Sequence, residues 1–211
     1  MRIRIKFAKT KAMRFTGNLD LHRAWERTFR RAGLPLAYSQ GFNPRPRIQL
    51  ASALPLGFTS QEEIADAWLE EDLPIEAIRA ALDGALPPGL HLLEITEIDL
   101  RSPALQTEVG AAEFIVILLD PLPNLEGRLE ALLQKEDLIR QRRGKSYDLR
   151  PLILDMASMP PGKTDQQRIF LRLAAREGAT GRPEEVIDAL GIPVYNTRVE
   201  RTKLILETTV G

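Results

Sequence analysis

The chain begins with a strict alternation between apolar and basic side chains. Positions 1, 3, 5 and 7 are apolar, and between them stand Arg2, Arg4 and Lys6. Because successive side chains of a strand point to opposite faces, this period of two predicts a half-buried strand over residues 1–9. One face of that strand would belong to a core, and the other face would be cationic.

At Asn18 the period changes from that of a strand to that of a helix. Apolar side chains recur at steps of three and four residues up to Ala32, and Gly33 followed by Pro35 ends the pattern. This spacing predicts an amphipathic helix with one buried stripe. Four arginines fall on its other side: Arg23, Arg27, Arg30 and Arg31.

The remaining pattern predicts further strands and helices in a repeated order. In the first half we expect strands near 47–52, 63–69 and 90–98, and a helix over 74–82. Residues 101–111 lack periodicity and are interpreted as a linker. After the linker we expect a strand at 114–119, a helix at 125–134, a hairpin or long strand at 138–156, a strand at 168–174, a helix at 183–190 and a strand at 199–206.

This order predicts an α+β protein made of two tandem ferredoxin-like (βαββαβ) sandwiches with antiparallel sheets. A basic N-terminal domain would span residues 1–100, and a second ferredoxin-like domain would span residues 112–211. In such a sandwich both helices cover one face of the sheet. The open face of the first domain would display Arg2, Arg4 and Lys6 to RNA, and the lack of stacking aromatics on that strand favours backbone recognition.

The charges are unevenly distributed, although the net charge is zero. Residues 1–50 contain twelve Lys and Arg against two acidic residues, whereas residues 51–100 contain one basic residue against eleven acidic ones. Such asymmetry is typical of proteins that bind nucleic acid or another polyanion. The alternative is that the acidic block folds onto the basic block and forms an internal layer of ion pairs.

The composition excludes several function classes. The sequence contains no cysteine, which rules out disulfides, zinc–thiolate sites, iron–sulfur clusters and thiol catalysis. The two histidines, His22 and His91, are far apart, and we expect neither a metal nor another cofactor. No apolar run approaches the roughly eighteen residues of a membrane span, and the N-terminus does not look like a signal peptide, so we expect a cytoplasmic protein without a membrane partner.

Residues 38–46 form a stretch rich in polar residues, glycine and proline beside the arginine-rich helix. Gly41 would let the backbone approach an anion closely while side chains donate hydrogen bonds. The candidate anion-binding residues here are Tyr38, Ser39, Gln40, Asn43, Arg45 and Arg47. The alternative is an ordered structural loop that packs Tyr38 and Phe42 onto the domain edge.

A second basic cluster lies in the predicted hairpin of the second half. It contains Arg140, Arg142, Arg143, Lys145 and Arg150. We consider Arg140, Arg142 and Arg143 as an extension of the anion-binding track. A solvated hairpin tip is the equal alternative.

Asp20 is the one carboxylate that we consider for catalysis, and it is a weak candidate. No second acid or base stands at a spacing that indicates acid–base chemistry. The alternative is that Asn18 or Asp20 caps the start of the helix by accepting free backbone N–H groups. The sequence therefore contains no convincing catalytic constellation.

Four short segments together resemble the radical-SAM-linked family of uncharacterised proteins, a domain of unknown function. They are Leu19-Asp20-Leu21, the helix end from Glu26 to Gly33, Ser39-Gln40-Gly41-Phe42-Asn43-Pro44 and Leu54-Pro55-Leu56-Gly57. Members of that family are encoded beside a radical SAM protein or fused to one. The resemblance therefore implies a radical SAM protein as partner, and it implies no reaction.

The sequence departs from that family's pattern at two places. Gly17-Asn18 stands where the family usually has Ser-His, and Arg45 stands where it has a histidine between two prolines. Proton transfer or metal binding by those histidines would be lost here, whereas an arginine favours anion binding.

From these features we expect an RNA-binding accessory module that presents transfer or ribosomal RNA to a radical SAM partner. One alternative is a protein–protein adaptor for such an enzyme, which docks through the charged segments. Another is a divergent endoribonuclease or RNA-modifying enzyme, because tandem ferredoxin-like domains also resemble CRISPR repeat-processing endoribonucleases and, more loosely, pseudouridine synthases.

Overall fold

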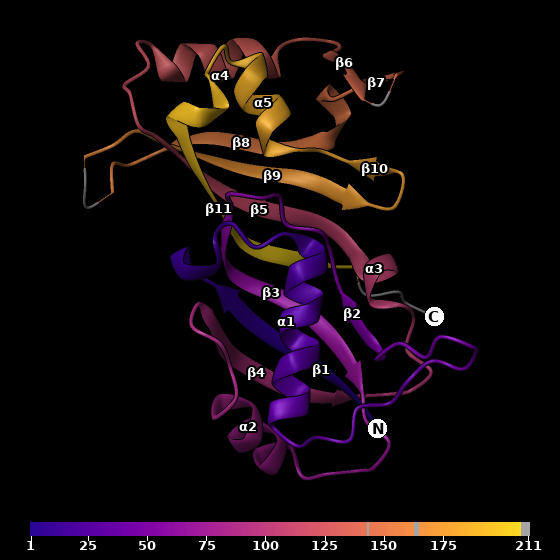
Figure 1. Ribbon diagram of the computed structural model, residues 1–211. Helices are drawn as coiled ribbons and strands as arrows, with labels where there is room; N and C mark the ends of the chain where they lie inside the picture. Colours follow the sequence, from indigo (N-terminus) through magenta and orange to yellow (C-terminus); the bar gives the residue numbers. More distant parts are fainter. Residues whose placement is uncertain (143, 163–164, 208–211) are drawn as a thin grey trace. The chain divides into compact units, whose positions relative to one another are not determined.

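The chain divides into two units in the computed structural model, which describes residues 1–142, 144–162 and 165–207. Unit 1 comprises Met1–Val109, and unit 2 comprises Gly110–Glu207. Each unit contains antiparallel strands together with helices, so the predicted mixed α+β character is confirmed (Figure 1). Among the described residues, no helix is long and apolar enough to cross a membrane.

Unit 1 has the element order predicted for the first half of the chain. It contains β1 (Arg2–Lys9), the 3-10 turn η1 (Lys11–Met13), α1 (Asn18–Arg31), β2 (Ile48–Leu50), β3 (Thr59–Trp68), α2 (Ile75–Asp83), β4 (Leu90–Ile98) and the short helix α3 (Leu105–Glu108). β1 pairs antiparallel with β3 and with β4, and β2 pairs antiparallel with β3. The strand order is therefore β4-β1-β3-β2, with the N-terminal strand inside the sheet.

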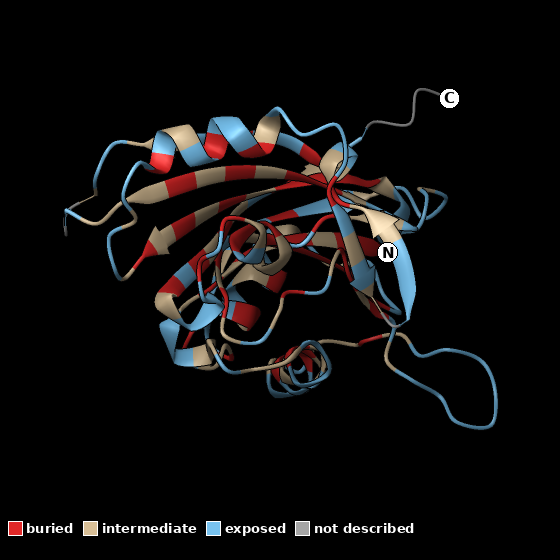
Figure 2. Ribbon diagram, turned by 90° about the horizontal axis from the view of Figure 1, so that it is seen from above, coloured by how far each residue is buried: buried red, intermediate tan, exposed pale blue. Residues whose placement is uncertain are grey.

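Helix α1 is buried along one side and exposed along the other, as its period predicts (Figure 2). Its N-cap is Gly17, and neither Asn18 nor Asp20 caps it with a side chain, which corrects the capping expectation. Asp20 remains in the first turn, where a negative charge complements the helix dipole. At the other end Gly33 adopts a φ of +68°, a left-handed conformation that glycine enters without steric cost.

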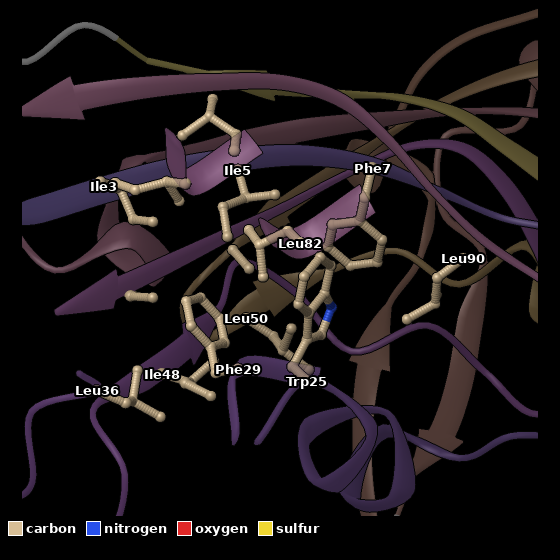
Figure 3. Packing of buried hydrophobic residues seen from close by; sticks show 14 of the residues in the cluster. Ile3, Ile5, Phe7, Trp25, Phe29, Leu36, Ile48, Leu50, Leu82 and Leu90 are labelled. Atoms are coloured by element: carbon tan, nitrogen blue, oxygen red, sulfur yellow. The ribbon is translucent and has the colours of Figure 1, made fainter. Parts of the chain in front are cut away.

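The core of unit 1 lies on one face of the sheet (Figure 3). Ile3, Ile5 and Phe7 of β1 are completely buried, which confirms the apolar face predicted from their alternation. Trp25 of α1 meets Phe7 edge to face, with 4.9 Å between the ring centroids. Leu82 of α2 belongs to the same cluster, so both helices pack on this face.

The opposite face is not the open cationic surface that the alternation predicted. Arg2 is buried, and its guanidinium lies 2.6 Å from the carboxylate of Asp66 and 2.6 Å from the carbonyl oxygen of Ser102. Arg4 stands opposite Asp66 in the strand register and lies 2.8 Å from its carboxylate and 2.7 Å from that of Glu108. An internal ion-pair layer forms here because a buried guanidinium is costly without carboxylate or carbonyl partners.

Electrostatics keep the strand cations charged. Burial disfavours the charged form of Arg4, but hydrogen bonds to Asp66 and Glu108 outweigh it and raise the pKa of its guanidinium. The hydrogen bond to Glu94, 2.8 Å away, raises the pKa of Lys6, which is the most exposed of the three strand cations. The three cations that were expected to meet a ligand are thus paired within unit 1.

The range predicted as a linker contains regular structure. Leu105–Glu108 form α3, and β5 already begins at Val109. Leu105 is completely buried, and its N–H donates to the side-chain oxygen of Gln49 on β2 at 3.0 Å. Contacts with β2, rather than local periodicity, therefore determine the structure of this segment.

Unit 2 contains the elements expected for the second half, with additions. They are β5 (Val109–Leu118), α4 (Leu125–Leu133), β6 (Ile139–Arg142), β7 (Lys145–Asp148), η2 (Arg150–Leu152), β8 (Ile153–Met159), β9 (Arg168–Arg176), β10 (Ala179–Thr180), α5 (Pro183–Ala189), η3 (Val194–Asn196) and β11 (Thr197–Leu206). β9 pairs antiparallel with β5, β8 and β10, and β11 lies beside β5. The hairpin expected within 138–156 is present as β6–β7, but β8 follows it as a further strand and β10 was not expected, so the six elements of unit 1 do not simply recur.

Candidate nucleic-acid interface

Three of the four helix arginines gather along one cavity of unit 1. Its volume is about 370 Å³. The lining residues are Met13, Thr16, Asp20, Arg23, Ala24, Arg27, Arg31 and Pro87. Arg23, Arg27 and Arg31, which we call the arginine row, follow one another at steps of four residues. Such a step returns to the same side of a helix about 6 Å further along its axis.

The guanidinium groups of the arginine row have different surroundings. Arg23 lies 3.3 Å from the carboxylate of Asp20, and both side chains are about two-thirds exposed. Arg31 donates a hydrogen bond to the carbonyl oxygen of Ala85 at 2.7 Å, which fixes its position. Arg27 is exposed and makes no hydrogen bond or ion pair within the described part of the chain. The row therefore presents positive charge that a single carboxylate partly neutralises.

The cavity lining outside α1 comes from η1, the segment that follows it and the turn before β4. The N–H of Thr10 donates to the carbonyl oxygen of Gly89 at 2.8 Å, and the N–H of Thr16 donates to that of Met13 at 2.9 Å. Gly89 has a φ of +96°, and a Cβ at this position would lie 2.8 Å from the Met13 side chain. Glycine is needed here because a side chain would displace Met13 and with it the cavity wall.

Arg30 and Arg47 lie outside the lining of this cavity. Arg30 pairs with Glu26 on the surface of α1 at 2.9 Å, a type of pair that adds little stability. The guanidinium carbon of Arg47 lies 4.6 Å from the ring centroid of Trp68, and that of Arg2 lies 4.8 Å from the same centroid. Arg47 is exposed and can still meet a ligand, whereas Arg2 is buried.

The loop between α1 and β2 is exposed along most of its length (Figures 1 and 2). A bridge between Tyr38 and Pro46 closes its base, and the Ser39 hydroxyl accepts a hydrogen bond from the N–H of Arg45 at 2.9 Å. Phe42 is fully exposed and Tyr38 is partly so, which contradicts the alternative in which both pack onto the domain edge. The polar candidates of the loop are exposed as well, but they are not among the cavity-lining residues: Ser39, Gln40, Asn43 and Arg45.

The cationic candidates of unit 2 make internal contacts. Arg142 lies 2.6 Å from the carboxylate of Glu185 and also donates to the Tyr147 hydroxyl at 2.8 Å. Arg140 lies 2.9 Å from Asp188. Both acids belong to α5, so these pairs attach the β6–β7 hairpin to that helix. Arg143 lies outside the described residues.

Asp20, the weak catalytic candidate, lies in the arginine-row cavity beside Arg23. No second acid and no histidine line the cavity in the part of the chain that the structure describes. Within the same residues, no group of three or more His, Asp and Glu side chains could hold a metal ion. Among the described residues, the cavity thus combines three arginines with one acidic residue.

Sequence reasoning missed the residues that complete the cavity. Met13, Thr16 and Pro87 come from segments that meet α1 only in the folded chain. Between the first two stands Phe15, whose side chain is 74% exposed. The sequence carried no signal for this exposure, because the exposed fraction of Phe15 is a property of the folded chain.

One protein-family model matches most of the chain. The family model described as "Uncharacterized protein conserved in bacteria" (DUF2344) matches residues 2–183, and the chain belongs to this family. No curated protein matches the chain.

Two solved structures show a distant likeness. The chain resembles one in the crystal structure of a Cbf5-Nop10-Gar1 complex, with 9% identity, a TM-score of 0.52, and coverage of 96% of this chain and 48% of that one. For the archaeal box H/ACA sRNP Nop10-Cbf5 complex the identity is 9%, the TM-score is 0.47 and the coverages are again 96% and 48%. The chain thus spans about half the length of each of these two chains, and at such identity the likeness to the first is one of fold.

Proposed function

We propose that the protein binds the phosphate backbone of RNA, and that the arginine row of α1 is the principal contact. The observation that carries this proposal is a cavity that is lined, among the described residues, by three arginines and one acidic residue. Guanidinium groups form short, charge-assisted and often bidentate hydrogen bonds to phosphate oxygens. An RNA backbone is therefore the polyanion that such a surface suits.

The ion-pair layer on the other side of the sheet supports the same proposal. Asp66 and Glu108 neutralise Arg2 and Arg4 inside unit 1, whereas the arginine row has Asp20 alone. The excess positive charge of residues 1–50 is thereby concentrated on α1 and the loop that follows it. The likeness to the Cbf5-Nop10-Gar1 complex concerns fold and supplies no ligand, so the proposal rests on these charges.

The resemblance of the sequence to the radical-SAM-linked family adds a partner to the proposal. In this view unit 1 holds a structured RNA, such as transfer or ribosomal RNA, and presents it to a radical SAM protein. Co-purification of the two proteins that persists after nuclease treatment would support the pairing. A pairing that depends on intact RNA would mean that the RNA alone joins them.

The test of RNA binding is a titration with fluorescent transfer RNA at several salt concentrations. The variant carries Arg23→Gln, Arg27→Gln and Arg31→Gln. Each phosphate contact contributes about −0.7 to −0.9 to the slope of log affinity against log salt, so loss of three contacts should flatten the slope by roughly two to three. The affinity at low salt should fall accordingly.

The matched control is Arg101→Gln. Arg101 is exposed in unit 1 and does not line the cavity. We expect this variant to keep the wild-type salt slope, whereas Arg27→Gln alone should flatten the slope by the share of one phosphate contact. Equal losses in these two single variants would show that net charge, and not the arginine row, governs binding. Absence of binding by the wild type at low salt would overturn the proposal.

An adaptor function is the second candidate, and one observation favours it. Phe42 is fully exposed in a loop whose base is closed by the Tyr38–Pro46 bridge, so the loop holds an apolar side chain in solvent. Such a side chain is suited to enter a pocket of a protein partner. Phe42→Ser would then abolish capture of a radical SAM protein and leave RNA affinity unchanged.

We also propose that the two units are variants of one ferredoxin-like design. In unit 2 the strand order β11-β5-β9-β8 corresponds to β4-β1-β3-β2 of unit 1 if the β6–β7 hairpin and β10 are insertions. A superposition of β5, β9 and β11 on β1, β3 and β4 that left α4 and α5 far from α1 and α2 would contradict this proposal.

A further inference from the structure

Phe15 is a large apolar side chain that the fold leaves in solvent. It is 74% exposed and stands in the chain between Met13 and Thr16, which both line the arginine-row cavity. A phenylalanine ring in solvent does not contribute the hydrophobic stabilisation that it would give if it were buried in the core. Phe15 is not itself among the lining residues, but its place in the chain between two of them leaves an exposed ring that a ligand of the cavity could cover.

The ring is held in place from one side. The guanidinium carbon of Arg14 lies 5.2 Å from the ring centroid. Arg14 is itself fixed, because its Nε donates to the carbonyl oxygen of Gly57 at 2.7 Å and its own carbonyl accepts from the N–H of Gly57 at 3.0 Å. Phe15 is therefore a ring with an anchored cation next to it and most of its surface accessible.

The spacing of the arginine row indicates what kind of ligand could reach this ring. Arg23, Arg27 and Arg31 follow each other at about 6 Å along the helix axis, a spacing comparable with that of successive phosphates along one nucleic-acid strand. Proteins that bind single strands combine a cationic groove for the backbone with aromatic rings on which bases stack. Bases of a duplex are already stacked on one another and cannot use such a ring.

We infer that the cavity receives a single-stranded segment of RNA, and that Phe15 stacks on one of its bases while the arginine row contacts the phosphates. This inference rests on the proposed function and narrows its substrate class to an unpaired region, such as a loop or an end. Arg14 stabilises the stacked ring from its other side through a cation–π contact.

The experiment compares three fluorescent probes: a short oligouridylate, an abasic ribose-phosphate oligomer of the same length and a blunt RNA duplex. Phe15→Leu keeps an apolar side chain but removes the ring. It should weaken oligouridylate binding about tenfold, the effect of one lost base–aromatic stack. Its binding to the abasic oligomer and its salt slope should stay at the wild-type values.

Two control variants make the result specific. Phe15→Tyr keeps a ring and should retain wild-type affinity for oligouridylate. Tyr195→Leu removes an aromatic ring that is 81% exposed in unit 2, and it should leave the affinity for every probe unchanged. Because Phe15 is exposed, all these variants should fold, which circular dichroism can verify.

The outcomes separate this inference from the proposed function. If the wild type binds oligouridylate and the abasic oligomer equally well, and Phe15→Leu changes neither, backbone binding stands and the stacking role is wrong. A preference for the duplex would likewise overturn the single-strand assignment. If no probe and no transfer RNA binds, the proposed function itself fails.

Discussion

Arg2 and Asp66 form a buried ion pair across the β1–β3 strand pair, with 2.6 Å between Nη2 and Oδ2. Asp66 is completely buried and also accepts hydrogen bonds from Arg4, so one carboxylate serves two guanidinium groups. Two residues from the most basic part of the chain are thereby removed from solvent. The basic character of the N-terminal quarter is thus partly a structural feature and only partly a binding surface.

Asp66→Asn should strongly destabilise unit 1. The substitution leaves Arg2 buried without its carboxylate, and breaking a buried ion pair costs about 3–5 kcal/mol. Both tryptophans, Trp25 and Trp68, belong to unit 1, so urea unfolding followed by tryptophan fluorescence reports on this unit. Glu94→Gln, which removes the exposed partner of Lys6, is the control and should cost less than about 1 kcal/mol. Similar costs for both variants would contradict the role assigned to Asp66.

Arg2→Met and Arg27→Met should have opposite effects on stability and RNA binding. Arg2 is buried, so its loss should lower the free energy of unfolding of unit 1, but by only about 1–3 kcal/mol because Arg4 still pairs with Asp66. The salt slope of RNA binding should stay unchanged. Arg27 is exposed and should show the reverse, with unchanged stability and weaker RNA binding. Urea unfolding and the salt titration together check this prediction. Weaker RNA binding by a stably folded Arg2→Met protein would mean that the sheet face which carries Arg2 does contact RNA, contrary to this prediction.

Gly89→Ala should distort the cavity. The new Cβ would lie 2.8 Å from the Met13 side chain and 2.9 Å from the Met13 backbone nitrogen, so η1 must shift. Gly33→Ala is the matched control, because its φ is also positive but nothing lies within 4 Å of the new Cβ. We expect Gly89→Ala to cost at least about 1 kcal/mol more than Gly33→Ala, as overpacking does, and to weaken RNA binding as well. Equal losses of stability in thermal unfolding would mean that the positive φ alone, and not a clash with Met13, causes the loss.

Tyr147 should make the stability of unit 2 depend on alkaline pH. Burial and the hydrogen bond that it donates to Glu185 raise the pKa of Tyr147 from 10.0 to about 12. A raised pKa means that the folded state holds the proton more tightly, so the stabilisation is present below pH 10 and is lost as the pH rises toward 12. The stability difference between wild type and Tyr147→Phe should therefore shrink over that range. Far-ultraviolet circular dichroism of urea unfolding can follow it, and a difference independent of pH would refute the prediction.

The elements of the fold were largely predictable because their periodicity is local. The alternation over residues 1–9 and the spacing of Leu21, Trp25 and Phe29 predicted β1, α1 and their buried faces, which the structure confirms. The segment at 101–111 was not predictable in the same way. It is too short for a period, and Leu105 is buried through contacts with β2, which is distant in the sequence.

The candidate site was predictable only in part. The sequence indicated four arginines on one side of α1, and three of them line the cavity. It could not separate them from Arg2, Arg4 and Arg142, because an arginine in an ion pair and an arginine in solvent look alike in a sequence. It also missed Met13, Thr16 and Pro87, whose contribution depends on how distant segments meet.

The sequence by itself determined the strands and helices, the apolar faces that form the core of unit 1 and the uneven charge, because each is a property of neighbouring residues. Only the tertiary structure decided which charges remain available. Strand register places Asp66 opposite Arg4 and beside Arg2, whereas Arg27 has no such partner within the described residues. Pairing depends on distances between residues far apart in the chain, and those distances exist only after folding.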